Sequence, residues 1–295
     1  MSETSVIIPF HDRVEWLEQA IACVLQQTYQ DFEIIVVDDG SEQEYRACIE
    51  NLDQRIRYIR QEQRGSAAAR NAGVKMAVGE FIAFLDSDDM FLPEKLAIQT
   101  GILRDHPDLV LVHSSFFRMD SSGNEIDMRP YGSFTGFVYP RIYFQCRILT
   151  STVVVRKKLF EKLEFEERAR YGQDAILFGK IAKLGEIWGV ERPLAKYRMH
   201  GNNVAKNPDK QIEAWKNVLQ FGIHADPDVK FIMRQQIESS YYLKFAFQYV
   251  QKKDYVPAFL CVMKSFLKWP FQKDLCMRLA RFILPQWIKG KWENS

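Results

Sequence analysis

The first ninety residues alternate between short apolar runs and segments whose apolar positions follow a helical period. The apolar runs, at residues 5–9, 32–37, 57–59 and 81–85, predict buried strands. Residues 13–28 and the small-residue segment 65–78 predict helices between them. Strand, helix and strand in succession predict right-handed parallel crossovers. The pattern therefore predicts an α/β fold with a Rossmann-like sheet flanked by helices.

The middle of the chain continues the alternation less regularly. The predicted strands there are residues 109–112, 151–156, 187–190 and 195–199. Helices are predicted from residue 95 to Arg104 and over residues 172–184. Residues 118–139 are rich in glycine, serine, aspartate and aromatic side chains. We expect this segment to form strands and loops that wall a pocket.

Beyond Pro208 glycine almost disappears and the helical period takes over. Four helices are predicted, over residues 211–221, 229–250, 255–267 and 275–288. This change predicts a domain boundary near residue 205, with an α/β domain over residues 1–205 and a C-terminal α-helical domain over 206–295.

Net charge, cysteine content and the length of the apolar runs limit the expected partners and the expected location of the protein. The net charge is only +2, so we expect no nucleic-acid partner. Residues 226–295 hold 12 Lys and Arg against 6 Asp and Glu, which is +6, so the preceding residues carry −4. Five scattered cysteines without C-x-x-C spacing indicate free thiols in a reducing compartment. The first residues do not have the pattern of a signal peptide, and no apolar run reaches the length of about 20 residues that a membrane-spanning helix needs. We therefore expect a cytoplasmic protein.

Three aspartates follow the strand at residues 81–85. Asp86, Asp88 and Asp89 are placed where strand ends in an open α/β sheet border the ligand crevice. Carboxylates this close repel one another, and a divalent cation relieves the repulsion; oxygen ligands suit Mg²⁺ or Mn²⁺ holding phosphates. The alternative is that these acids cap the helix that begins near Pro93. A cap needs only one acid, so we favour the metal.

Six short motifs resemble the inverting family 2 glycosyltransferases with the GT-A fold. They are Ser5-Val6-Ile7-Ile8-Pro9, Val36-Val37-Asp38-Asp39-Gly40-Ser41, Ala69-Arg70-Asn71-Ala72-Gly73, Asp86-Ser87-Asp88-Asp89, Gly172-Gln173-Asp174 and Tyr197-Arg198-Met199-His200. Each motif is weak alone, but the order and spacing of all six match the family over residues 4–205. The resemblance implies a mixed, mainly parallel GT-A sheet and transfer of a sugar from a UDP-sugar.

The resemblance also implies roles for individual residues. The metal, Mn²⁺ or Mg²⁺, would be held by Asp88 and Asp89 with support from Asp86, and His200 and Arg198 would contact the metal or the pyrophosphate. The implied nucleotide-binding residues are Pro9, Phe10, His11, Asp12, Asp39, Arg70 and Asp88. His11-Asp12 departs from the family's usual Tyr-Asn. Simpler interpretations are a turn cap for Asp39, a surface salt bridge for Arg70 and a structural role for His200.

Asp174 matches the family's catalytic base, which takes the proton of the acceptor hydroxyl. Gln173 replaces the glutamate that commonly precedes this base, so repulsion from a neighbouring carboxylate is absent. A first-turn helix acid is the structural alternative for Asp174.

The C-terminal residues and the lack of membrane-spanning helices indicate how the expected enzyme would reach its acceptor. Around 275–292, basic residues beside an apolar face with tryptophans fit a helix on an anionic membrane or a helix packed on its own domain. We expect one sugar to be transferred per visit to a glycan or lipid-linked saccharide in surface polysaccharide synthesis, with peripheral contact at the inner face of the cell membrane. One competing hypothesis is a sugar-nucleotide pyrophosphorylase, but such an enzyme needs a glycine-rich loop after the first strand, and residues 9–12 contain no glycine. The other is a non-catalytic nucleotide-sugar-binding scaffold.

Overall fold

The structure, a computed structural model, describes residues 2–201 and 203–272. The chain divides into two compact units. The first contains Met1–Ile142 and Cys146–His200, and the second contains Tyr143–Gln145 together with the residues from Gly201 on. Each unit is described by itself below.

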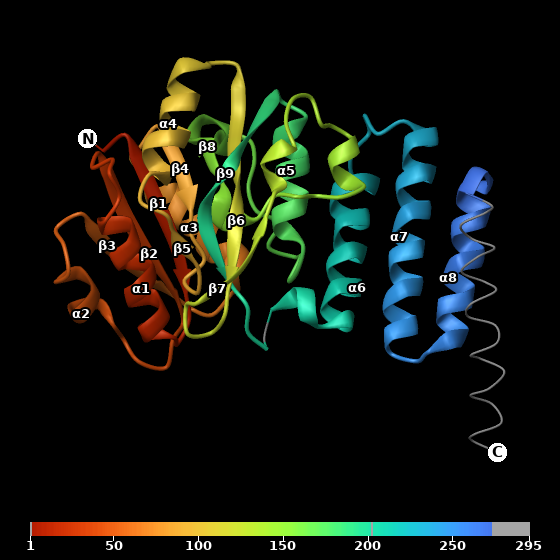
Figure 1. Cartoon of the computed structure of the whole chain (residues 1–295), viewed down its shortest axis with the longest axis horizontal. Coiled ribbons are helices and arrows are strands. Elements are labelled where there is room, and N and C mark those ends of the chain that lie inside the picture. Colours follow the sequence, from red (N-terminus) through yellow and green to blue (C-terminus); the bar gives the residue numbers. More distant parts are fainter. Residues whose placement is uncertain (1, 202, 273–295) are drawn as a thin grey trace. The chain divides into compact units, whose positions relative to one another are not determined.

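A nine-stranded sheet forms the centre of the first unit (Figure 1). Its strands are β1 (Thr4–Phe10), β2 (Phe32–Asp39), β3 (Ile56–Gln61), β4 (Phe81–Phe84), β5 (Met90–Phe91), β6 (Leu109–Met119), β7 (Glu125–Arg129), β8 (Val154–Arg156) and β9 (Glu186–Arg198). The strand order is β3-β2-β1-β4-β8-β6-β9-β5, and β7 pairs with β6. The order places β1 between β2 and β4, whose ends carry the aspartate motifs.

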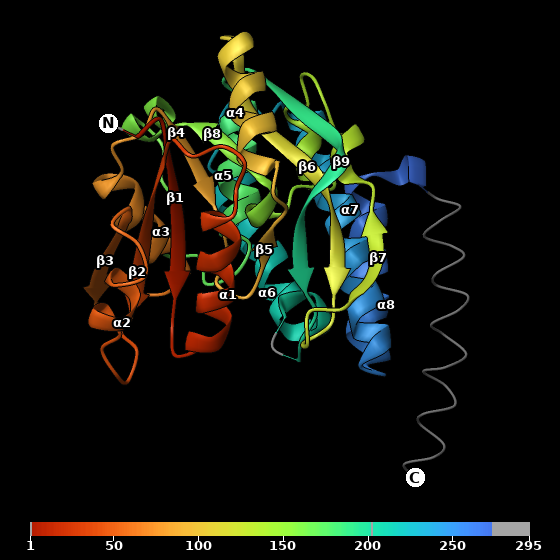
Figure 2. The ribbon, with the colours of Figure 1, turned by 60° about the vertical axis from the view of Figure 1, so that its left-hand side comes forward.

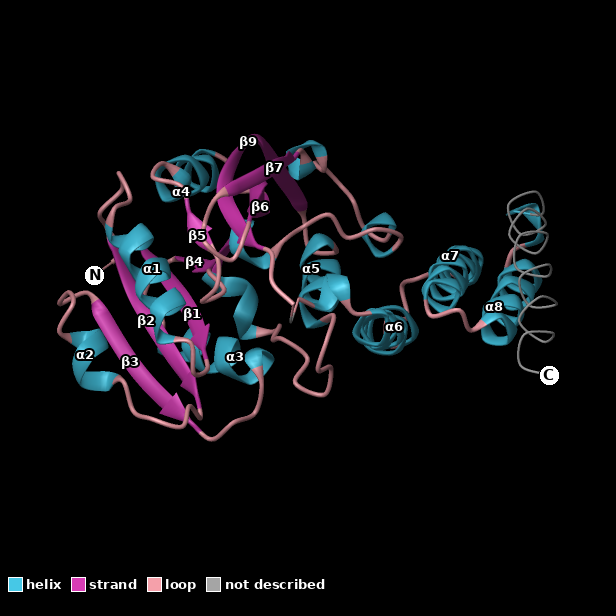
Figure 3. Ribbon diagram, turned by 60° about the horizontal axis from the view of Figure 1, so that its bottom comes forward, coloured by secondary structure: helices cyan, strands magenta, loops and turns pink. Residues whose placement is uncertain are grey.

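The sheet is mixed. Strands β3, β2, β1 and β4 are parallel, β8 is antiparallel to both β4 and β6, and β9 runs parallel to β6. Figure 2 shows β6 and β9 side by side. The carboxyl ends of β1, β2 and β3 lie at the same end of the sheet, and the arrowheads of the three strands point the same way in Figure 3.

Helices cover both faces of the parallel strands because successive side chains of a strand point to opposite faces. Ile8 and Val36 face α1 (Val14–Leu25) and share a core with its Leu17. Ile7 faces the other way, towards α3 (Ser66–Met76), where Gly73 lets the helix lie against the strand. The two apolar faces and their helices form the buried core that supports the strand ends.

Further helices complete the first unit. They are α2 (Arg46–Glu50), α4 (Lys95–Asp105) and α5 (Gln173–Ala182). Short 3₁₀ segments lie at Tyr131–Ser133, Thr150–Thr152 and Lys157–Glu161, and another, Arg141–Tyr143, ends at the first residue of the second unit.

The second unit is helical. Its α-helices are α6 (Pro208–Asn217), α7 (Phe231–Gln251) and α8 (Tyr255–Lys268); a π-helical turn, Val218–His224, extends α6, and 3₁₀ turns lie at Val204–Lys206 and Pro270–Gln272. Asn207 caps α6 by accepting hydrogen bonds from the backbone N–H groups of Asp209 and Lys210. Helices α7 and α8 pack around Ala246, Ala258 and Val262. Within the described residues, no helix has the length and apolarity needed to cross a membrane.

The predicted α/β fold with a helical C-terminal region is confirmed, with local differences. Residues 187–190 and 195–199 were expected as two strands, but β9 is continuous. Its pairing with β6 shifts register on both sides of the Ser115–Pro193 pair, since a proline cannot donate a ladder hydrogen bond. Helix α2 has only five residues, too few for a periodic signal. The predicted helix 275–288 lies outside the described residues.

Candidate active site

Side chains at and just beyond the carboxyl ends of β1, β2 and β4, with two from α3, line a cleft of about 440 Å³. The lining residues are Pro9, Phe10, His11, Asp12, Arg13, Asp39, Ser66, Arg70, Asp86, Ser87 and Asp88. All seven residues expected to bind a nucleotide are among them. This position, at the carboxyl ends of parallel strands, is where open α/β sheets bind ligands.

Asp39 lies at one end of the cleft, held by donors on both carboxylate oxygens. The backbone N–H of Arg64 and the Gln61 side chain donate to Oδ1, and the Gly65 N–H donates to Oδ2, each at 2.8 Å. Gly65 adopts a φ of 93°, which only glycine reaches without strain, so the loop can fold back over the carboxylate. Three donors fix its orientation before any ligand arrives.

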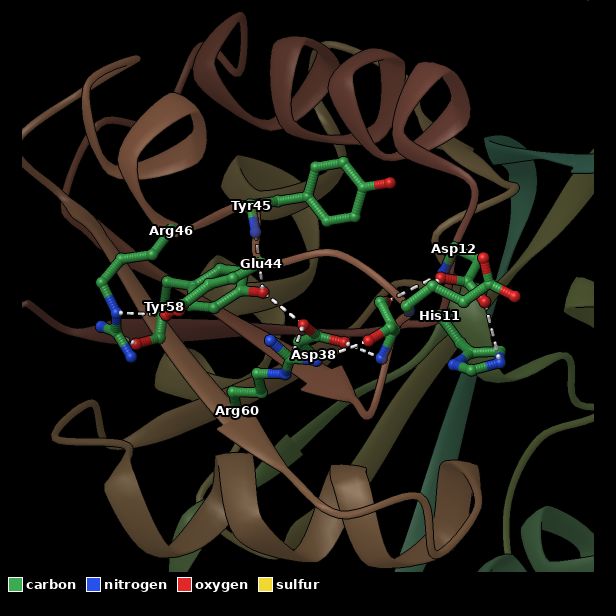
Figure 4. Close-up of polar contacts among 10 residues, drawn as sticks. His11, Asp12, Asp38, Glu44, Tyr45, Arg46, Tyr58 and Arg60 are labelled. Carbon is green, nitrogen blue, oxygen red and sulfur yellow. Dashed lines mark hydrogen bonds and ion pairs between the residues drawn. The ribbon is translucent and has the colours of Figure 1, made fainter.

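Asp38, the preceding residue, is buried, does not line the cleft, and organises the turn beside it (Figure 4). Its carboxylate accepts hydrogen bonds from the Ser41 N–H at 2.8 Å and from the Tyr58 hydroxyl, and Arg60 lies 3.6 Å away. The pKa of Tyr58 is raised by burial and by this bond. Ser41 Oγ in turn accepts a hydrogen bond from the Asp12 N–H at 3.0 Å. Asp38 therefore caps the turn, and Asp39 faces the cleft.

The three aspartates after β4 have three different partners. Asp86 pairs with Arg70, and Asp88 lies 2.7 Å from Nε2 of His200. Asp89 accepts hydrogen bonds from Ser151 Oγ and from the Arg198 N–H at 2.9 Å. Among the described residues, no three His, Cys, Asp or Glu side chains are grouped to hold a metal. The structure thus brings Asp88 and His200 together but does not gather the four expected ligands.

Asp89 is buried, which differs from the expected position of a metal ligand. Burial raises the pKa of this carboxyl, and the negative charges of Asp88 and Asp86 raise it further. Ser151 Oγ also accepts a hydrogen bond from the Asp86 N–H, so Asp89 connects the aspartate loop, residue 151 and the end of β9. The hydrogen bonds of Asp89 hold the segments around the cleft in place, and its side chain does not line the cleft.

Arg198 also differs from its expected phosphate-binding position, because its side chain is only 1% exposed. Nε donates to the Asp88 carbonyl at 2.8 Å, Nη1 to the Ser121 carbonyl at 2.9 Å and Nη2 to Gln19 Oε1 at 2.8 Å. Burial lowers its pKa while the nearby aspartates raise it. The guanidinium therefore holds the backbone of Asp88 in place.

Trp16, in the first turn of α1, links these groups. Its ring centroid lies 5.1 Å from that of His200 and 5.3 Å from the Arg198 guanidinium carbon. His200 packs on the indole while its Nε2 faces Asp88, so the imidazole is oriented by two contacts.

Arg70 lines the cleft from α3, whereas Asp174, at the start of α5, is not among the lining residues. The buried Arg70 pairs with Asp86 and stacks 5.3 Å from the Phe165 ring. Asp174 is partly buried in the first turn of α5, and the Ala175 N–H donates to its Oδ1 at 2.8 Å. Burial raises the pKa of Asp174; the Ala175 N–H and the Arg70 charge lower it, and Asp86 raises it.

Gln173, where the resembled family commonly has glutamate, forms a contact that the sequence did not predict. Its Nε2 donates to Ser66 Oγ at 2.8 Å, and Ser66 lines the cleft. The amide therefore connects the start of α5, and with it Asp174, to the start of α3.

Comparison with known proteins places these features in a family. The profile of glycosyl transferase family 2 matches residues 5–163. The chain belongs to this family. An uncharacterized glycosyltransferase of Rickettsia bellii is 36% identical over 223 residues, covering 75% of this chain and 32% of that protein. The match covers 32% to 38% of the length of this protein and of two further relatives, from Rickettsia felis and Rickettsia conorii.

An Escherichia coli relative, named UDP-Glc:alpha-D-GlcNAc-diphosphoundecaprenol beta-1,3-glucosyltransferase WfgD, is 28% identical over 219 residues, covering 73% of this chain and 84% of that protein.

Two solved structures share the fold. Staphylococcus aureus TarS 1–349 in complex with UDP-GlcNAc has a TM-score of 0.68 at 17% identity, over 98% of this chain and 92% of that one. The mannosyltransferase PcManGT from Pyrobaculum calidifontis, in complex with GDP-Man and Mn²⁺, has a TM-score of 0.60 at 15% identity, over 99% of this chain and 88% of that one. Together with the mixed sheet, they confirm the GT-A fold.

Proposed function

We propose that the protein is a metal-dependent, inverting glycosyltransferase that moves one sugar from a UDP-sugar to a glycan or lipid-linked saccharide in surface polysaccharide synthesis. The observation that carries this proposal is the cleft itself. It has an acid held by three donors, Asp39, and a carboxylate–imidazole pair, Asp88 and His200, beside it. The complex of TarS with UDP-GlcNAc and the donor in the name of the E. coli relative, UDP-Glc, support a UDP-sugar.

In this proposal Asp39 accepts a hydrogen bond from the uracil ring through Oδ2, because Oδ1 already accepts two hydrogen bonds and Oδ2 accepts only one. Pro9, Phe10, His11 and Asp12 surround the nucleoside on the β1 side, and Arg70 reaches the nucleoside or the diphosphate from α3. Arg198 acts through the Asp88 backbone, since its own donors are taken by protein acceptors.

The donor set fits a divalent metal. Mn²⁺ and Mg²⁺ are commonly bound by one or two protein side chains, with substrate phosphates and water completing the coordination. Asp88 and His200 would hold the ion, and Asp86 is placed in the same cleft wall. When bound, the ion neutralises charge on the diphosphate leaving group. The Mn²⁺ complex of PcManGT supports this assignment.

Asp174 is proposed as the base. As the bond between the anomeric carbon and the phosphate oxygen breaks, the acceptor oxygen bonds to that carbon from the opposite face. The hydroxyl proton passes to the Asp174 carboxylate, and the electron pair of the broken bond leaves with UDP. The raised pKa makes this carboxylate a better proton acceptor.

A membrane contact would bring a lipid-linked acceptor within reach. The acceptor in the name of the E. coli relative, alpha-D-GlcNAc-diphosphoundecaprenol, is lipid-linked. Helix α8 also exposes Val256, Leu260, Met263 and Leu267, which recur at helical spacing on one face. We propose that the C-terminal helices contact the membrane surface peripherally.

The test is UDP release by the purified protein with Mn²⁺ and a panel of UDP-sugars. We expect turnover by the wild type and a loss of at least roughly 100-fold in Asp174→Asn. A UDP-sugar that raises the melting temperature without being turned over would instead support a scaffold. Pyrophosphate release from UTP and a sugar phosphate would support a pyrophosphorylase.

A further inference from the structure

The cleft has two chemically different ends. At one end His11 Nε2 lies 3.1 Å from Nε2 of Gln63, whose neighbours Gln61 and Arg64 hold Asp39. At the other end Asp88 contacts His200, and His200 packs on Trp16. Under the proposed function the first end takes the nucleobase, and the second takes the diphosphate.

The second end is poor in available positive charge. A diphosphate entering it meets Asp86 and Asp88, so the site needs cationic donors. Arg70 is already neutralised by Asp86, and Arg198 donates to protein acceptors from all three nitrogens. These two arginines therefore leave little charge for the phosphates.

Arg13 is the remaining arginine of the cleft wall. Its guanidinium carbon lies 4.9 Å from the centroid of the Trp16 ring, on the same indole that supports His200. In the part of the chain that the structure describes, the Arg13 guanidinium has no carboxylate within ion-pair distance. Stacking on the indole orients a guanidinium while its N–H donors stay available.

The local helix does not explain an arginine at this position. Arg13 occupies the N-cap of α1, and its side chain makes no capping hydrogen bond. Serine, threonine, aspartate and asparagine are the stabilising N-cap residues, and a positive charge at a helix N-terminus opposes the helix dipole. A residue that is unfavourable for its own helix but lines a cleft is expected to bind the ligand of that cleft.

We propose that Arg13 binds the diphosphate of the donor, with Trp16 as the residue that positions it. This inference rests on the proposed function, because it assumes that a nucleoside diphosphate enters the cleft. The guanidinium fork pairs with two phosphate oxygens and stabilises the charge that gathers on UDP as the sugar leaves.

The test compares the binding of UDP and uridine by calorimetry in the presence of Mn²⁺, with uridine at millimolar concentrations. Arg13→Ser removes the guanidinium but supplies a favoured N-cap residue, so we expect a melting temperature no lower than that of the wild type. We expect UDP to bind roughly 10- to 100-fold more weakly and uridine to bind within about twofold of wild type. Arg13→Lys should recover part of the UDP affinity, because it keeps the charge but not the fork.

Arg192→Ser is the matched control, since Arg192 pairs with Glu94 and does not line the cleft. We expect it to bind UDP like the wild type. Unchanged UDP affinity in Arg13→Ser, or an equal loss for UDP and uridine, would overturn the role of Arg13 while leaving the proposed function intact. A wild-type protein that binds no UDP would overturn the proposed function, and the Arg13 inference with it.

Discussion

Asp88 and Asp89 are neighbours in the chain, yet their carboxylates have opposite surroundings. Asp88 faces the cleft and His200, whereas Asp89 is buried between Ser151 and the Arg198 N–H. Asp38 and Asp39 divide in the same way, one into a turn and one into the cleft. The function of each acid therefore depends on the donors that its neighbours supply.

Replacing Asp89 and Asp88 by alanine should separate structural from ligand-binding roles. Asp89→Ala leaves the buried Ser151 hydroxyl and Arg198 N–H without an acceptor, which should lower the free energy of unfolding by about 2–4 kcal/mol. Asp88→Ala should cost less than about 1 kcal/mol, because this side chain is partly exposed, but it should weaken Mn²⁺ binding. Urea unfolding and Mn²⁺ paramagnetic resonance measure the two effects. Equal effects of both variants would contradict this division.

The raised pKa of Asp174 predicts two pH effects. The base must be ionised, so kcat/KM should fall as the pH drops through the raised pKa, and this limb should be absent in Asp174→Asn. Because the folded state binds this proton more tightly than the unfolded chain, ionisation costs stability above the unfolded pKa of about 3.9. Asp174→Asn should therefore be at least as stable as wild type at neutral pH.

The stability difference should shrink as the pH falls towards the unfolded pKa, where both states hold the proton. Thermal unfolding at a series of pH values measures it. A wild type that is more stable than Asp174→Asn at neutral pH would contradict the assignment of burial as the main cause.

Helix α3 shows how an element places a functional side chain. Its small residues let it lie against β1 and β2, and this close approach carries Arg70 to the cleft wall. A Cβ atom added at Gly73 would lie 2.5 Å from Cγ2 of Ile7. The glycine is therefore required by packing, not by backbone conformation.

Gly73→Ala should thus destabilise the protein, by about 1–3 kcal/mol, because α3 must move away from the sheet. Gly101→Ala in α4 is the matched control, since a Cβ there meets nothing within 4 Å. It should stabilise by about 0.5–1 kcal/mol through helix propensity. Denaturant unfolding measures both changes, and a tolerated Gly73→Ala would show that the α3 interface is looser than described.

The sequence predicted most elements because strands and longer helices carry a periodic signal of their own. It failed for α2, which is too short, and it divided β9 at a proline that the structure accommodates as a register shift. At the site, most cleft residues belong to local motifs that the sequence showed, but Arg13 and Ser66 were not predicted as site residues. The burial of Asp89 and Arg198 could not be predicted, because it depends on contacts between residues more than sixty positions apart.

Charge and apolar surface are unevenly distributed over the whole molecule. Residues 226–295 carry +6, and α8 exposes an apolar face in which Leu260 is 53% and Leu267 is 74% exposed. The expected amphipathic helix at 275–288 lies outside the described residues, so the proposed membrane contact depends on the α8 face and on charge.

The full chain should therefore bind phosphatidylglycerol vesicles at low salt, and added salt should weaken the binding. Replacing Leu260, Met263 and Leu267 by serine should reduce binding with little change in melting temperature, since all three side chains are exposed. Vesicle co-sedimentation measures the effect, with uncharged phosphatidylcholine vesicles as the control. Equal binding of the triple variant would show that this face does not contact lipid.

The central claim is that one nucleoside diphosphate spans the cleft from Asp39 to the Asp88–His200 pair. A crystal structure with UDP and Mn²⁺, in which anomalous scattering locates the ion, tests it most directly. The account predicts uracil against Asp39 and Mn²⁺ between Asp88 and the diphosphate. A nucleotide bound outside this cleft, or an ion that contacts neither Asp88 nor His200, would contradict it.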